Sequence, residues 1–212
     1  MLAVPSDRGC CVGYYIRVLS QSTKPVTLAA VQRAVAETRL GARIEDVRKD
    51  GRVLVRFTVV TKEGDPVLVF ERNPVEEGSV GKGDVEDFLE QLPDAKPASA
   101  ARWLAAFLPR VKVVYALQLF GRESHRAAIS AVRDLCWTPG QSIIQADFEG
   151  FSNDAGYHIL WQFSDRVRGG WWMAVLGKDG TWKRFRMNLG NRAHRKAFLA
   201  GRVPAGVQVK RD

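Results

Sequence analysis

The sequence predicts an α+β protein built from two similar halves, residues 1–109 and residues 110–212. Segments that alternate apolar and polar residues, as pleated strands do, are interspersed with segments of three-to-four spacing, as in amphipathic helices. The order strand, helix, antiparallel strands, helix occurs once in each half, and 29 residues separate both Tyr15 from Ile44 and Tyr115 from Ile144. We therefore expect two β-α-β-β-β(-β)-α halves, each an antiparallel sheet backed by helices, related by an internal duplication.

In the first half, turn and cap residues set the expected element limits. Pro25 stands where a helix can begin without losing a hydrogen bond, and Gly41 follows its expected end. Glycine-bearing turns divide the apolar runs that follow into strands, and a polar loop leads to Asp84 or a neighbour as a helix cap. The expected strands are 14–19, 44–47, 53–60 and 67–70, and the expected helices are 25–39, 84–92 and 98–108.

The second half contains the most informative stretch, a predicted three-strand meander between residues 157 and 189. Lys178-Asp179-Gly180 is a strong hairpin signal, because glycine accepts a positive φ. In the last strand Phe185 and Met187 alternate with Arg184 and Arg186, which predicts an apolar face on the core and a cationic face outside. The expected strands are 111–120, 142–148, 157–163, 171–176 and 181–187, and the expected helices are 124–135 and 191–200, the latter capped by Asn191 and followed by Gly201.

Composition argues for an ordinary globular protein without a metal or cofactor. Of the 212 residues, 46% are hydrophobic and 26% charged, and no apolar run is long enough to cross a bilayer. The start of the chain has no basic leader, so we expect a cytoplasmic protein. Cys10, Cys11 and Cys136 lack the spacing of a zinc site, and the three histidines are scattered. We expect free thiols, no metal and no membrane association.

Positive charge is concentrated at the end of the chain. Residues 166–212 contain 12 Lys and Arg against two acids, a net charge of +10, whereas the preceding 165 residues carry 20 bases and 21 acids. The total of +9 therefore comes from the last quarter of the sequence. A local positive field attracts polyanions, such as nucleic acid, an anionic membrane or an acidic protein.

The cationic face of the last predicted strand is the best candidate site. Aromatic rings stack on bases and guanidinium groups contact phosphates, so such a face can hold single-stranded nucleic acid. We therefore predict a non-enzymatic binding protein that recognises nucleic acid or another polyanion. The predicted site residues lie on the last strand and helix: Trp182, Lys183, Arg184, Arg186, Arg192, Arg195 and Lys196.

Three other interpretations stay open. Trp182 could pack across strands on Trp171 or Trp172, with the arginines forming a solvated outer face. The basic half could instead bind an acidic protein, with its aromatic residues as anchors. Finally, carboxylates and an imidazole lie close together in the sequence and could perform acid–base catalysis, although no nucleophile accompanies them at a recognisable spacing. The residues of this cluster are Asp147, Glu149, Asp154 and His158.

Overall fold

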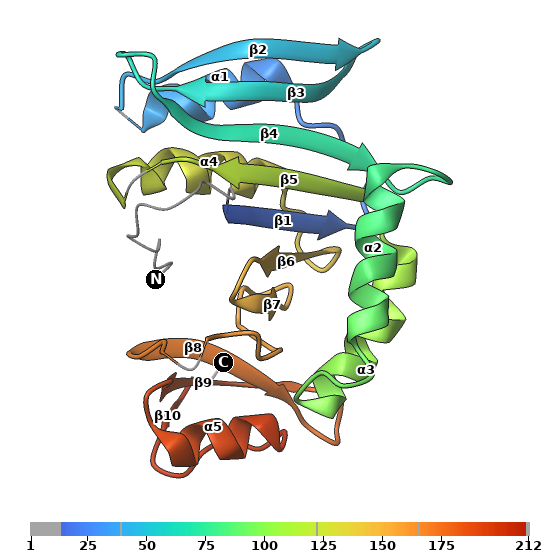
Figure 1. Cartoon of the computed structure of the whole chain (residues 1–212), viewed down its shortest axis with the longest axis vertical. Coiled ribbons are helices and arrows are strands. Elements are labelled where there is room, and N and C mark those ends of the chain that lie inside the picture. The colour runs from blue at the N-terminus through green and yellow to red at the C-terminus, as the bar shows by residue number, and fades with distance from the viewer. Residues whose placement is uncertain (1–13, 39, 122, 165, 211–212) are drawn as a thin grey trace.

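In the computed structural model, which describes residues 14–38, 40–121, 123–164 and 166–210, the chain is an α+β protein (Figure 1). The described residues form a seven-stranded antiparallel sheet, a three-stranded antiparallel sheet and five α-helices. The strands of the large sheet are β1 (Tyr14–Ser20), β2 (Arg43–Asp50), β3 (Val53–Val60), β4 (Pro66–Pro74), β5 (Val113–Leu119), β6 (Ser142–Ala146) and β7 (Gly150–Ser152). The small sheet contains β8 (Gly170–Leu176), β9 (Trp182–Asn188) and β10 (Gln208–Val209). The helices are α1 (Leu28–Glu37), α2 (Val80–Gln91), α3 (Ala98–Phe107), α4 (Arg126–Cys136) and α5 (Arg192–Leu199), and two 3₁₀ turns cover Leu108–Arg110 and Glu123–His125.

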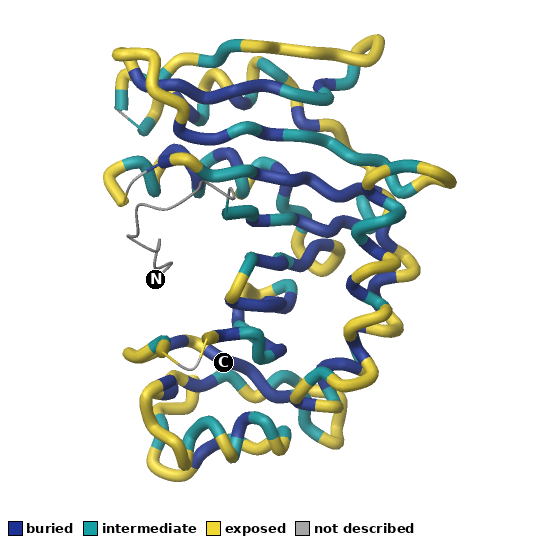
Figure 2. The backbone as a smooth tube through the Cα atoms, viewed as in Figure 1, coloured by how far each residue is buried: buried dark blue, intermediate teal, exposed yellow. Residues whose placement is uncertain are grey.

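The large sheet has the strand order β2-β3-β4-β5-β1-β6-β7. The first strand therefore lies between two strands of the second half, with Val18 opposite both Tyr115 of β5 and Ile144 of β6. Strand β2 forms the outer edge and is largely exposed, whereas the central strands are buried (Figure 2). Strands from both sides of residue 109 are thus hydrogen-bonded in one sheet.

Helices cover the two faces of the large sheet with separate apolar cores. On one face, α1 and α4 pack together and on inward residues such as Ile16, Phe57 and Tyr115. On the other face, α2 and α3 pack on residues that include Leu19 and Val114. Because adjacent residues of a strand point to opposite faces, Val18 and Leu19 serve different cores.

The small sheet has its own core and is joined to the large sheet through His158. Phe185, Met187 and Leu189 are buried beneath Phe198 of α5, as the alternation in this strand predicts. The main chain of His158 bridges Ser152 of β7 on one side and Met173 of β8 on the other. The last helix also matches its prediction, since Asn191 caps it and Gly201 follows its end with a φ of +70°.

The strand order does not confirm the predicted internal duplication. In the first half the strand after the helix, β2, lies at the outer edge of the sheet, and the chain returns toward the centre through β3 and β4. In the second half the corresponding strand, β6, pairs directly with β1 at the centre, and β7 follows it outward. The halves share an element order along the chain but not a connection order in the sheet.

Two local predictions are wrong. Residues 157–163 form no strand beyond the bridges of His158, and the short strand β7 of the large sheet lies just before them, outside the strands that we expected. The second helix starts before Asp84, because the hydroxyl of Ser79 accepts a hydrogen bond from the Lys82 amide and caps α2. A side chain at Gly81 would place its Cβ 2.6 Å from the Pro74 carbonyl oxygen, so a glycine is needed where α2 leaves β4.

Candidate functional site

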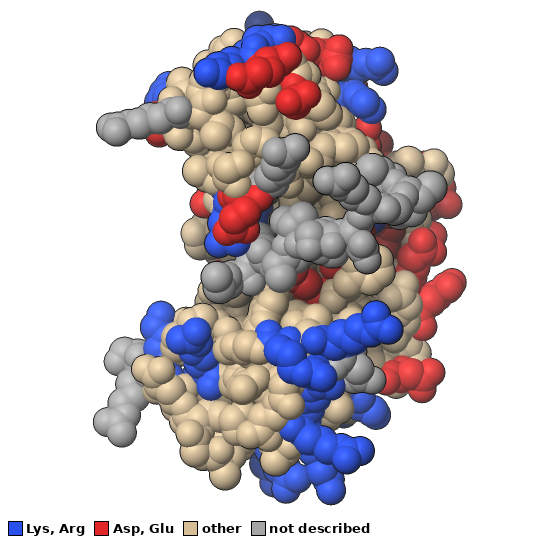
Figure 3. Space-filling model, turned by 60° about the vertical axis from the view of Figure 1, so that its left-hand side comes forward, with Lys and Arg blue, Asp and Glu red and all other residues tan. Residues whose placement is uncertain are grey.

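The basic residues of the C-terminal part gather around the small sheet. In Figure 3, Lys and Arg side chains form several groups on the lower part of the molecule, where β8, β9, β10 and α5 lie, and the visible Asp and Glu side chains there lie along the right-hand margin, while the upper part mixes both signs. Between Arg166 and Lys210 the only acid is Asp179, which accepts hydrogen bonds from the amide and hydroxyl of Thr181 in the β8–β9 turn. Turn hydrogen bonding thus occupies this carboxylate.

The ion pairs also differ between the small sheet and the rest of the molecule. In the first part of the chain, arginines are neutralised by carboxylates, as in Arg17–Asp147 at 2.7 Å and Arg43–Glu45 at 2.7 Å. Within the described ranges, no carboxylate lies at ion-pair distance from Lys183, Arg186 or Lys196. The positive charges of these three side chains are therefore not neutralised by carboxylates of the part of the chain that the structure describes.

An aromatic and cationic surface covers the side of the small sheet that faces away from α5. Cross-strand pairing places Trp172 of β8 opposite Arg186 of β9. The Trp172 ring packs edge-on against Tyr157, with centroids 6.0 Å apart, and remains 38% exposed. We call this surface the Trp172 face; its members are Tyr157, Trp172, Arg184, Arg186 and Lys210.

Tyr157 holds the remaining cations of this face. The guanidinium carbon of Arg184 lies 5.7 Å from the centre of the Tyr157 ring, within the range of a cation–π contact. The Lys210 ammonium donates a hydrogen bond of 3.0 Å to the Tyr157 hydroxyl and lies 5.7 Å from the centre of the ring. One buried tyrosine therefore positions two cations next to an exposed indole.

The seven residues predicted from the sequence fall on different sides of the small sheet. Arg184 and Arg186 lie on the Trp172 face, whereas Trp182 packs edge-on against Trp103 of α3 at 5.4 Å and is partly covered. The basic residues of α5 lie on the opposite side of the sheet, because α5 covers its apolar face. Those residues are Arg192 and Lys196, which are exposed, and Arg195; Lys183, also exposed, shares the side of Phe185 and Met187.

Arg195 has a structural role in the fold. Its guanidinium group donates to the carbonyl oxygens of Leu189 and Val167 and lies 5.4 Å from the centre of the Trp161 ring. These contacts tie α5 to the loop between residues 161 and 170.

Sequence reasoning missed Trp172, Tyr157 and Lys210. A signal for Trp172 was present, since Trp171 and Trp172 are adjacent in a strand and must point to opposite faces. One of the two therefore had to lie outside the core. Tyr157 and Lys210 are brought to this face only by tertiary packing.

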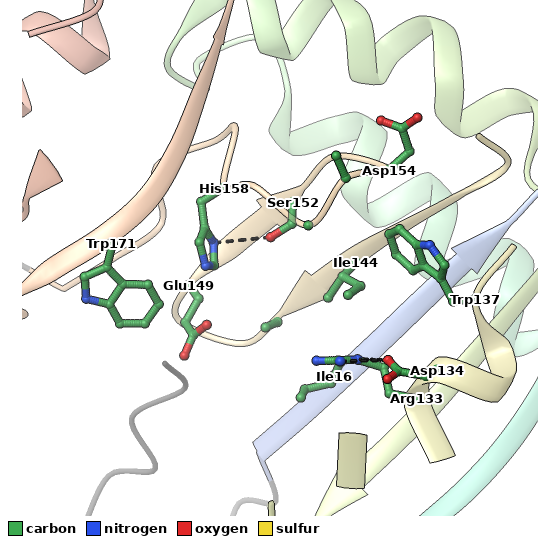
Figure 4. Close-up of a pocket in the computed structure, with 13 residues that line it drawn as sticks. Ile16, Arg133, Asp134, Trp137, Ile144, Glu149, Ser152, Asp154, His158 and Trp171 are labelled. Carbon is green, nitrogen blue, oxygen red and sulfur yellow. Dashed lines mark hydrogen bonds and ion pairs between the residues drawn. The ribbon is translucent and has the colours of Figure 1, made fainter. Parts of the chain in front are cut away.

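A cavity of about 380 Å³ lies on the other side of the β7–β8 junction, next to the C-terminal end of α4 (Figure 4). Trp171 and Glu149 stand across it from Trp137 and Asp134. The polar groups of its wall include the hydroxyl of Ser152, which lies 3.4 Å from Nδ1 of His158. The lining residues are Ile16, Arg133, Asp134, Trp137, Ile144, Ala146, Glu149, Ser152, Asp154, Ala155, Gly156, His158 and Trp171.

Burial controls the ionisation of the cavity groups. Glu149 is only 5% exposed, and burial raises the pKa of its carboxyl from 4.5 to about 7. Burial lowers the pKa of His158 from 6.5 to about 4, so this imidazole is neutral at pH 7. The pKa of the buried Tyr14 hydroxyl is raised by burial and by the nearby Glu149 carboxylate. The Tyr14 hydroxyl, as a donor beside the carboxyl, lowers the pKa of Glu149 in part, although neither this hydroxyl nor Oε2 of Glu149 meets a partner at full hydrogen-bond distance and angle among the described residues.

The structure brings together part of the acid–base cluster suggested by the sequence. Glu149, Asp154 and His158 line the cavity, but Asp147 does not. Asp147 instead accepts hydrogen bonds from the Arg17 guanidinium, at 2.7 Å, and from the Tyr15 amide, at 3.0 Å. Its carboxylate is therefore occupied in holding β1 against β6.

The remaining sequence predictions concern metals, thiols and membranes. In the described part of the chain, no group of three or more His, Cys, Asp or Glu residues is placed to hold a metal ion. Cys136 is a buried free thiol whose pKa is raised by burial, while Cys10 and Cys11 lie outside the described residues. Among the helices described, none has the length and apolar character needed to span a bilayer.

Comparison with known proteins gives no relative for this chain: no family model, no curated protein and no solved structure matches it.

Proposed function

We propose that the protein binds nucleic acid, preferentially single-stranded, through the Trp172 face. The observation that carries this proposal is an exposed indole flanked by cations on one side of a sheet, with Arg186 directly opposite it. Bases stack on such rings irrespective of sequence, and the cations contact the phosphates between stacked bases. This is the binding function predicted from the sequence, but the aromatic residue proposed to stack on bases is Trp172 rather than Trp182.

Charge and geometry have separate roles in this proposal. The excess of 12 basic over two acidic residues after residue 165 supplies long-range attraction for any polyanion. The Trp172 ring adds a contact that only a polymer with flat bases can use. The cations of α5, including the predicted Arg192 and Lys196, lie on the opposite side of the sheet and contribute to the field rather than to base contacts.

The test is the binding of a labelled oligothymidylate of about 20 nucleotides, followed by fluorescence polarisation at several salt concentrations. Arg186→Gln should weaken binding and make the salt dependence shallower by about 0.7 in the slope of log K against log salt, because one phosphate contact is lost. Arg43→Gln is the matched control, since it removes the same charge from an exposed arginine on the far edge strand β2. Equal effects of both variants would contradict the proposal.

An acidic protein partner is the alternative, and the aromatic residue separates the two. Trp172→Ala should weaken oligothymidylate binding by about 1–3 kcal/mol through lost stacking, and should leave binding of poly-glutamate unchanged. If Trp172→Ala weakened both ligands equally, or if poly-glutamate bound more tightly than the oligonucleotide, the acidic-protein interpretation would replace ours.

A further inference from the structure

The cavity beside α4 is a second candidate site, on the opposite side of the β7–β8 junction from the Trp172 face. We propose that it binds a small flat organic cation, such as an amidinium or guanidinium group carried on a ring, with Glu149 as the counter-charge. The site is independent of nucleic-acid binding, and its residues do not belong to the Trp172 face.

The buried carboxyl of Glu149 offers a hydrogen-bond acceptor to a ligand in this cavity. Buried carboxyl oxygens in proteins are nearly always hydrogen-bonded, because an unpaired one loses its hydration without compensation. Glu149 is 5% exposed and lines the cavity; the neutral Tyr14 hydroxyl lies beside the carboxyl, but Oε2 forms no hydrogen bond of full distance and angle among the described residues. A donor brought by a ligand would satisfy this oxygen.

The charges of the lining select a cation. The Arg133 guanidinium donates hydrogen bonds of 2.9 and 2.7 Å to the Asp134 carboxylate, so the two charges offset each other. The imidazole of His158 is uncharged at pH 7 because burial lowers its pKa to about 4. The carboxyls left without a cationic partner among the described residues are Glu149 and Asp154, so the lining favours a cation over an anion.

The walls select a flat molecule. Trp137 and Trp171 stand on opposite sides of the cavity (Figure 4), and the apolar side chains of Ile16 and Ile144 complete its floor. Tryptophan is the ring that attracts cations most strongly, and it also accepts stacked aromatic groups. A volume of about 380 Å³ is within the range of small-molecule sites.

Binding of a cation should couple to proton release from Glu149. The carboxyl has a pKa of about 7 in the free protein, and a cation beside it favours the charged form and lowers that pKa. The titratable groups that act on Glu149 or line the cavity with it are the Tyr14 hydroxyl, which stays protonated, the neutral His158, and the amino group of the chain, whose positive charge lowers the pKa of Glu149. Asp147, Asp134 and Arg133 are held in ion pairs of their own, and Asp154 also lines the cavity. Affinity for the cation should therefore rise with pH and level off above pH 7.

Benzamidine is a suitable probe, with benzamide as its neutral analogue and benzoate as its anionic one. Isothermal titration of the full chain at about pH 8 should show benzamidine binding at least about tenfold tighter than benzamide, since a hydrogen bond between charged groups is stronger than one to a neutral donor. Benzoate should not bind. Glu149→Gln should reduce benzamidine affinity by about tenfold or more, whereas Glu90→Gln, which alters an exposed carboxyl on α2, should not change it.

A second measurement protects the test against misfolding of the variant. With the unaltered protein at about pH 6.5, the binding heat of benzamidine should differ between buffers of different ionisation enthalpy, because a proton is released; at about pH 8.5 it should not. Equal affinity for benzamidine and benzamide, an unaffected Glu149→Gln variant, absence of saturable benzamidine binding, or no proton release at the lower pH would each overturn the proposal. None of these outcomes bears on oligonucleotide binding.

Discussion

Replacing Glu149 by glutamine should abolish a specific pH dependence of folding stability. The carboxyl has an ordinary pKa of 4.5, which approximates the unfolded chain, and burial raises its pKa to about 7 in the folded protein. The folded state therefore prefers the protonated form. The stability contributed by this proton is fully present below pH 4.5 and is lost as the pH rises through 7.

The magnitude follows from the difference between the two pKa values. Each pKa unit corresponds to about 1.4 kcal/mol, so the folded protein should lose about 3 kcal/mol relative to the unfolded chain between pH 4.5 and 7 through this residue alone. Glutamine has nearly the shape of protonated glutamate and never ionises. At low pH the variant should therefore match the unaltered protein within about 1 kcal/mol, and above pH 7 it should be more stable by about 3 kcal/mol.

The measurement is urea unfolding of both proteins at several pH values. His158 changes stability in the opposite direction, because its lowered pKa of about 4 favours the neutral imidazole, and stability from it is lost as the pH falls through 6.5 to 4. Subtracting the two proteins removes this contribution, since both contain His158. A stability difference that stays constant from about pH 4 to pH 8 would refute the reasoning, as would a Glu149→Gln variant that is less stable at high pH.

Two further predictions compare neighbouring or equivalent positions. Phe185→Ala should cost about 3–5 kcal/mol of unfolding free energy because the ring is fully buried against Phe198, whereas Arg186→Ala, one residue along β9, should change it by about 0.5 kcal/mol or less. Similar losses for the two variants would mean that the two faces of β9 are wrongly assigned. Gly150→Ala should destabilise the protein by about 2 kcal/mol or more, because a Cβ would lie 2.8 Å from the Leu160 carbonyl oxygen at a φ of +90°. Gly180→Ala, at a φ of +77° with open space around it, should cost about 1 kcal/mol, and thermal unfolding that ranks the two variants in reverse would contradict the backbone geometry at Gly150.

The sequence predicted correctly those helices and strands that a pattern of a few neighbouring residues specifies. The alternation of β9 placed Phe185 and Met187 in a core, and Asn191 with Gly201 set the limits of α5. Each of these signals depends on neighbouring residues only, namely a side chain that alternates, a cap or a positive φ. The existence of the C-terminal sheet and helix, and their basic character, could be predicted in this way.

The stretch between residues 157 and 163 shows why alternation alone is insufficient. Its residues alternate in type, but the side-chain oxygen of Asn153 accepts from the amides of Ala155 and Tyr157 and turns the chain there. Further on, the Trp161 amide donates to the Lys96 carbonyl in the loop between α2 and α3 rather than to a strand. A strand requires a partner along its whole length, and partners are set by tertiary structure.

The position of β1 illustrates the same limit at the level of the whole fold. Nothing within residues 14–20 specifies that they pair with β5 and β6, more than 90 residues away. The predicted division at residue 109 treats the halves as separate sheets, and the insertion of β1 between two later strands joins them instead. The same long-range packing brings Tyr157 and Lys210 together, and so the Trp172 face could be predicted only in part.

The two candidate sites share one rigid support, and this follows from the backbone at Tyr157 and His158. The side chain of Tyr157 contacts Trp172 and Lys210, while that of His158 lines the cavity beside Ser152. The His158 amide donates to the Trp172 carbonyl at 3.2 Å, and its own carbonyl accepts from the Ala174 amide at 2.8 Å. Adjacent residues of an extended chain point in opposite directions, so a single backbone segment fixed to β8 presents one side chain to each site. A substitution that disturbs this segment should therefore change both binding activities together, whereas Trp172→Ala and Glu149→Gln, which leave its hydrogen bonds intact, should change one each.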